Sequence, residues 1–266
     1  MSSAPTYLLV DAHVHLHDCF DLAEFLDAAR INFQIQSRQL GLTGKKFGVL
    51  LLTECSGVAA FTNLVTQQAS LNQQLSNWNI STTSEATSLR LTHTSGDSLF
   101  IMAGRQVVTK ENIEVLTLIT EATIKDGLSL EETIQQAITS GSLPVLPWGV
   151  GKWIGKRGTL VSNQLAADAD QLFTGDNGGR PGFWPQSKLC QEHRQLPGSD
   201  PLPLSDEVQR PGSFGFVTPV PAYWTEEEPA SALKQLLQST QYKLRTYGQS
   251  QSFWKFVKNQ TLLRLT

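Results

Sequence analysis

The chain has 266 residues, of which 40% are hydrophobic and 17% are charged, and its formal net charge is −3. This length suits one large domain, and the near-neutral charge offers no basic surface of the kind that binds nucleic acid. No apolar stretch approaches the roughly 20 residues that span a bilayer, and the first residues lack the features of a signal peptide. The three cysteines are scattered and form no CxxC motif, which favours a cytoplasmic protein with reduced thiols.

The first predicted strand lies within Tyr7–His17 (YLLVDAHVHLH), where an apolar run passes into alternating polar residues. Side chains of an extended chain alternate between two faces, so Asp11, His13, His15 and His17 are expected on the same side. Neutral imidazole is the commonest metal ligand, so this row of histidines favours a metal site over core packing. We predict that His13 and His15 bind the metal. Asp11 binds it or orients a ligand, and His17 is a candidate for contact with substrate.

Strands and helices alternate along the rest of the chain. Strands are expected over 47–53, 113–119, 143–148, 171–174 and 214–220, and helices over 20–40, 59–75, 129–140, 159–169, 186–193, 230–238 and 252–263. Residues 78–108 are rich in Ser and Thr and predict a small inserted β segment. About seven βα units in such a chain favour a single domain over 1–266, a (β/α) barrel of seven-stranded or TIM-like type. An open doubly wound sheet is the alternative, although no GxGxxG motif follows the first strand.

Carboxylates follow several of the predicted strands, among them Glu54, Asp176 and Asp200. In a βα barrel the carboxyl ends of the strands form one rim, so these side chains are expected to converge with the histidines. Glu54 and Asp200 are candidate metal ligands, and Asp176 and Asp200 are candidate catalytic residues. The alternatives are a water-exposed carboxylate for Glu54 and helix caps for the two aspartates.

A glycine-rich loop with basic and aromatic residues, Trp148–Gly158, follows one of the later strands. Lys152 and Arg157 in this loop, together with Arg180, are candidates for binding an anionic substrate such as a phosphate or carboxylate. A surface loop with packed tryptophans is the alternative, and Arg180 could instead pair with Asp176. The loop is no Walker motif, because the spacing fails and no Ser or Thr follows the lysine.

The segment Asp11–Leu16 has the pattern D-x-H-x-H, and with it the chain resembles metal-dependent hydrolases of the amidohydrolase and PHP (polymerase and histidinol phosphatase) type. The resemblance implies a distorted seven-stranded barrel in which His13 and His15 bind a divalent metal such as Zn, Mn or Fe. It also implies that Asp200, in the segment Gly-Ser-Asp, binds the metal or activates water.

Such families supply further histidines from central strands, but here no histidine occurs between His93 and His193. Glu54, Asp176 or a carbamylated Lys152 would have to take their place. We therefore expect a hydrolase in which a metal activates water against a small anionic substrate, a phosphoester before an amide because of the basic loop. The alternative is an inactive barrel that binds a small anion or a protein partner. Neither interpretation involves nucleic acid or a membrane.

Overall fold

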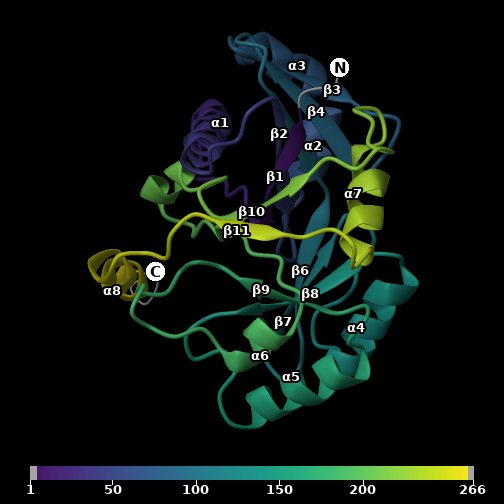
Figure 1. The fold of residues 1–266 in the computed structure, drawn as a ribbon, viewed down its shortest axis with the longest axis vertical. Coiled ribbons are helices and arrows are strands. Elements are labelled where there is room, and N and C mark those ends of the chain that lie inside the picture. The colour runs from purple at the N-terminus through teal and green to yellow at the C-terminus, as the bar shows by residue number, and fades with distance from the viewer. Residues whose placement is uncertain (1–4, 263–266) are drawn as a thin grey trace.

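The computed structural model describes residues 5–262 and shows two mixed β-sheets (Figure 1). The larger sheet has the order β11 (Arg245–Tyr247), β10 (Gly215–Pro219), β1 (Thr6–Val14), β2 (Lys45–Leu52), β5 (Ser98–Met102), β4 (Ser88–His93) and β3 (Trp78–Thr82). The smaller sheet has the order β6 (Gly104–Val108), β7 (Glu114–Leu118), β8 (Leu143–Trp148) and β9 (Phe173–Asp176).

The predicted closed barrel, seven-stranded or TIM-like, is wrong. β1 and β2 are parallel as expected, and so are β8 and β9; β5, from the predicted insertion, also pairs parallel with β2. However, β10 runs antiparallel to β1, β4 runs antiparallel to both its neighbours, and β7 does the same in the smaller sheet. Both sheets keep two edges, so no ring of parallel strands forms.

The connections within residues 78–108 explain the antiparallel pairing of β4 with β3 and β5. The links at 83–87 and 94–97 are far shorter than the crossover of a dozen or more residues that parallel pairing needs, so these strands fold back as hairpins. One residue, Ala103, then separates β5 from β6, and the chain passes there from the larger sheet to the smaller one. The predicted β insertion is therefore part of the framework of both sheets.

The helices cover the sheets in layers. They are α1 (Leu22–Gln39), α2 (Ala60–Thr66), α3 (Gln68–Gln74), α4 (Leu130–Thr139), α5 (Lys156–Ala167), α6 (Lys188–Glu192), α7 (Pro229–Gln238) and α8 (Phe253–Leu262), with a 3-10 helix, η1, at Ser205–Gln209. The last residue of the helix expected over 252–263 lies outside the described residues. None of the described helices has both the length and the apolar character that crossing a membrane requires.

The core lies on both faces of β1. Leu9 packs in one cluster with Phe25 and Phe33 of α1, whereas Leu8 belongs to a second cluster that includes Leu236 of α7 and residues of the smaller sheet. Figure 1 shows α1 and α7 on opposite sides of the larger sheet, and α4 and α5 beside the smaller sheet. Because β1 is central and covered, the polar residues at its carboxyl end are held in a buried position.

Candidate metal centre

Three side chains from distant parts of the chain meet at the carboxyl end of β1. The Nε2 atoms of His13 and His15 are 3.1 Å apart, and each lies 3.4 Å from Oδ1 of Asp200. Both histidines are buried, and Asp200 is 13% exposed. Their ligand atoms lie close enough together to hold one metal ion.

The spacing of these three atoms fits a single ion. Ligand atoms at the usual 2.0–2.1 Å from a zinc ion, in tetrahedral geometry, are about 3.3 Å apart, and the observed separations are 3.1 to 3.4 Å. Imidazole nitrogen and carboxylate oxygen both suit the divalent metals expected here. Three protein ligands also leave a position for water, as in catalytic zinc sites.

Burial and charge set the protonation of the three groups. Burial lowers the pKa of His13 to about 3, although the nearby charge of Asp200 opposes this shift. Burial also acts to lower the pKa of His15, but the hydrogen bond to Asp200 and the contact with Cys55 outweigh it and raise the pKa to about 9. Burial acts to raise the pKa of Asp200, yet the two histidines hold it well below its ordinary value. A bound cation would replace the proton of His15, because ligation requires neutral imidazole.

Close backbone contact places Asp200 against β1. The Asp200 N–H donates to the His13 carbonyl at 2.8 Å, and the residue has a left-handed φ of 48°. Gly198 makes the approach possible, since a Cβ there would lie 2.1 Å from the His13 nitrogen. The amide of Asn177 donates to Oδ2 of Asp200 at 2.8 Å, so that Oδ1 is left facing the histidines.

Asp11 anchors this loop and does not join the three ligand atoms. Its carboxylate accepts from the Ser199 N–H at 2.8 Å, from the Ser199 hydroxyl at 2.6 Å and from the Gly212 N–H at 2.8 Å. Burial raises the pKa of Asp11 to about 6, although these hydrogen bonds act to lower it. The register of β1 against β2 shifts between Asp11 and Val14, and such a bulge re-aims side chains. The geometry therefore matches the orienting alternative for Asp11.

The other two predicted carboxylates have partners elsewhere. Glu54 is buried and accepts from the Phe61 N–H at 2.5 Å, in the first turn of α2. Asp176 accepts from the Gly178 N–H at 2.9 Å, and also from Arg180 at 2.9 Å and Gln186 at 3.0 Å. Burial raises the pKa of both groups. Among residues 5–262, neither belongs to the cluster of potential metal ligands.

The predicted substrate-binding residues divide into two groups. The ammonium of Lys152 pairs with Glu114 at 2.5 Å, and its charge acts, as a minor cause, to lower the pKa of His13 and of Asp200. The His17 ring stacks on His15 with 5.4 Å between ring centroids, and its Nε2 lies 2.9 Å from the Pro201 carbonyl oxygen.

The two arginines of this set bond locally. Arg157 donates to the Gly151 carbonyl at 3.1 Å. Arg180 pairs with Asp176, and its guanidinium lies 5.6 Å from the centre of the Trp148 ring. Arg180 therefore matches the pairing alternative.

Two neighbours of the cluster had not been singled out in the sequence. The Gln106 amide donates to the Cys55 sulfur at 3.9 Å, and these side chains act to raise the pKa of His13 and His15, respectively. Cys55 follows directly after Glu54 beyond the end of β2, so its place beside the first strand could have been inferred. Gln106 lies on β6 and had no such signal. It lines a cavity of about 260 Å³ with Arg105 and Lys125.

Comparison with known proteins shows similarity of fold. PsfC from Pseudomonas syringae PB-5123 matches with a TM-score of 0.54 and 15% identity, over 98% of this chain and 100% of that protein. PfuEndoQ from Pyrococcus furiosus, a lesion-specific endonuclease, matches with a TM-score of 0.51 and 11% identity over 91% of this chain, which spans 59% of the endonuclease chain. No protein-family model and no curated protein matches. The similarity concerns the fold alone.

Proposed function

We propose that this protein is a metal-dependent hydrolase whose divalent ion is held by His13, His15 and Asp200. The observation that carries the proposal is the convergence of three ligand atoms, 3.1 to 3.4 Å apart, from segments separated by more than 180 residues. A buried cluster of this kind costs folding free energy unless its groups pair with each other or with a metal. Zn, Mn and Fe are the candidate ions.

A bound divalent ion would supply a water molecule with its pKa lowered from about 15.7 toward about 7. The chain itself holds and orients the ligands. The amide of Asn177 fixes one oxygen of Asp200, and Asp11 fixes the loop that carries Asp200. Such supporting hydrogen bonds set ligand orientation, and their loss typically weakens metal binding 10- to 100-fold. With its second oxygen engaged by Asn177, Asp200 acts as a ligand, and Asp176 has no direct role in our proposal.

The substrate is a small anionic phosphoester. The charge of Lys152, which is paired with Glu114, acts on His13 and Asp200, and Arg105 and Lys125 line the cavity beside Gln106 together with the carboxylates Glu54 and Asp126. The endonuclease among the similar structures also acts on phosphate esters, which agrees with this choice by analogy of fold only. His17 borders the cluster and would contact the substrate. Action on nucleic acid is not part of the proposal, given the net charge of −3. The cytoplasmic location stays a prediction from the three free cysteines.

Elemental analysis of the purified protein tests the proposal directly. Wild-type protein, stripped with a chelator and reloaded with Zn²⁺, Mn²⁺ or Fe²⁺, is expected to retain about one ion per chain. His13→Ala/His15→Ala is expected to retain none, whereas His193→Ala, which alters a histidine bonded to the Leu189 carbonyl, should match wild type. Hydrolysis of p-nitrophenyl phosphate should follow metal content, and p-nitroacetanilide should react more slowly. Equal metal content in wild type and the double variant would overturn the proposal.

A further inference from the structure

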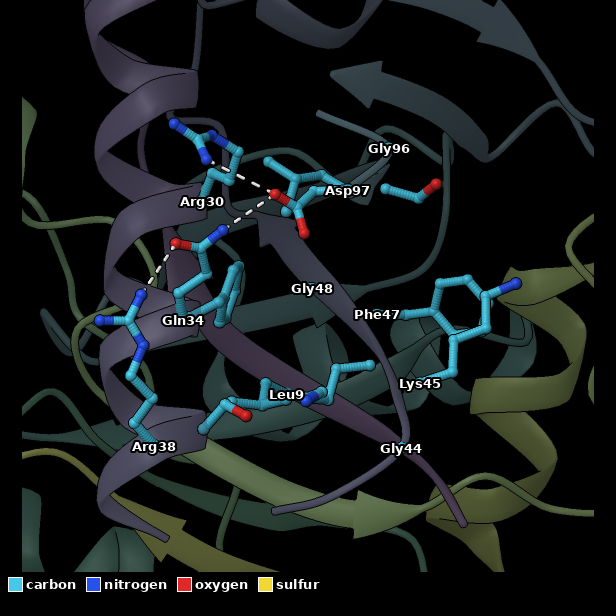
Figure 2. Close-up of a pocket in the computed structure, with 15 residues that line it drawn as sticks. Leu9, Arg30, Gln34, Arg38, Gly44, Lys45, Phe47, Gly48, Gly96 and Asp97 are labelled. Carbon is cyan, nitrogen blue, oxygen red and sulfur yellow. Dashed lines mark hydrogen bonds and ion pairs between the residues drawn. The ribbon is translucent and has the colours of Figure 1, made fainter. Parts of the chain in front are cut away.

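A separate cavity lies at the other end of β1 from the candidate metal centre. It is formed between α1 and the beginnings of β2 and β5 (Figure 2). It reaches Leu9 and Lys45, near the amino ends of β1 and β2, whereas His13 and His15 lie at the carboxyl end of β1. Its volume of about 460 Å³ is within the range of small-molecule sites.

The inner wall of the cavity is apolar. Leu9, Phe33 and Leu99 line it, and all three belong to the core cluster on the α1 side of the larger sheet. The absence of a side chain at Gly48 lets Phe33 and Leu99 pack directly against the β2 backbone, since a Cβ there would lie 2.5 Å from side-chain atoms of both residues. Such a wall suits a flat apolar group, because burying apolar surface is favourable in proportion to its area.

The rim of the cavity is mainly cationic. Arg30 and Arg38 come from α1, Lys45 and Lys46 come from β2, and Asp97 is the one carboxylate among the lining residues. Residues 30, 34 and 38 of α1 are four apart, so they share one face of the helix. Figure 2 shows Arg30, Gln34 and Arg38 along this face, with Asp97 across from the first two.

Two of these cations are free to meet a ligand. Asp97 already accepts from Gln34 at 2.9 Å and from Arg30 at 3.5 Å, and Lys45 pairs with Glu226 at 2.6 Å. Arg38 donates to Oε1 of Gln34 at 3.4 Å, which orients its guanidinium without neutralising it. Across the part of the chain that the structure describes, no carboxylate lies within 4.0 Å of the charged nitrogens of Arg38 or Lys46.

We propose that this cavity binds a small organic anion, with an apolar ring against the inner wall and an acidic group at Arg38 and Lys46. The two halves of such a ligand match two features of the cavity. The acidic group would gain charge-assisted hydrogen bonds, which are roughly twice as strong as neutral ones. The ring would bury its own apolar surface against Phe33 and Leu99, which are themselves only 5% and 2% exposed.

Fluorescence titration with 8-anilinonaphthalene-1-sulfonate tests both halves, because this dye has an aromatic body and one anionic group. N-phenyl-1-naphthylamine, its neutral counterpart, serves as the matched probe. The sulfonate is expected to bind with one site per chain, and the neutral compound about tenfold more weakly. Arg38→Ala/Lys46→Ala should weaken sulfonate binding about tenfold and leave binding of the neutral compound unchanged. Arg38→Lys/Lys46→Arg should retain binding of the sulfonate.

Two controls separate this cavity from other places where the dye could bind. Lys110→Ala/Lys188→Ala removes two exposed lysines that do not line the cavity, and it should leave affinity unchanged. Phe183→Ser/Trp254→Ser removes exposed aromatic rings, 71% and 79% accessible, which offer an alternative apolar surface. Unaltered sulfonate affinity in Arg38→Ala/Lys46→Ala, or its loss in the aromatic double variant, would overturn the proposal. Equal affinity for the two dyes in wild type would do the same.

Discussion

The hydroxyl of Ser199 donates a hydrogen bond of 2.6 Å to Oδ2 of Asp11, across 188 positions of the chain. This bond joins the first strand to the residue directly before Asp200. It explains how a loop far along the sequence delivers a carboxylate oxygen to within 3.4 Å of two histidines. Asp11 is therefore a positioning residue for the candidate metal centre.

Replacing this carboxylate should weaken both the fold and metal binding. Asp11→Ala leaves the buried N–H groups of Ser199 and Gly212 without their acceptor, so we expect a loss of about 2–4 kcal/mol in the free energy of unfolding. Metal affinity should fall about 10- to 100-fold, because the loop that carries Asp200 loses its anchor. Urea unfolding and metal titration measure the two effects, with Asp18→Ala as an exposed control. Unchanged stability of Asp11→Ala would contradict the anchoring role.

A methyl group at position 198 should displace the ligand loop. In Gly198→Ala the new Cβ would meet the His13 backbone nitrogen at 2.1 Å, so the two segments must separate, at a cost of about 1–3 kcal/mol or more. The number of metal ions that Gly198→Ala retains per chain should fall together with its stability. Gly182→Ala is the matched control, because nothing lies within 4 Å of a Cβ at that exposed position. Thermal melting with elemental analysis distinguishes them, and similar melting of the two variants would count against the close approach.

Glu54 should matter for stability without contributing to metal binding. In Glu54→Ala the Phe61 N–H loses its acceptor at the start of α2, with an expected cost of about 0.5–2 kcal/mol. Metal content should remain that of wild type, since this carboxylate lies outside the three-residue cluster. The exposed Glu121 offers a control whose change to Ala should alter stability by no more than about 0.5 kcal/mol. Loss of metal from Glu54→Ala would return this residue to the ligand set.

The cysteines should differ sharply in reactivity. Burial, with the nearby charge of Asp176, raises the pKa of the Cys190 thiol to about 12, so its thiolate fraction at pH 8 is on the order of 10⁻⁴. Cys19 is exposed. Iodoacetamide at pH 8 should therefore modify Cys19 in the native protein and Cys190 only after unfolding, as mass spectrometry of the digested protein would show. Equal modification of both in native protein would contradict the burial of Cys190.

The local pattern of the sequence predicted the first strand, its buried apolar residues and the common side of His13 and His15. The reason is that alternation along an extended chain depends on backbone geometry alone. The convergence with Asp200 was expected from a barrel rim, and it occurs without a barrel, because β1 is still central and the segment at 197–200 bonds directly to it. Binding of a metal by these residues stays a prediction.

Strand direction and the partners of each carboxylate were decided only by the tertiary structure. An apolar run fits a parallel or an antiparallel neighbour equally well, so β10 could not be assigned its direction against β1 from hydrophobicity. Glu54 and Asp176 follow strands just as Asp200 does, but one meets the first turn of a helix and the other an arginine and a glutamine. A carboxylate takes whichever donors the folded chain brings within about 3 Å. The sequence alone determined which residues carry side chains of the metal-ligand type, and packing over long separations decided which of them meet.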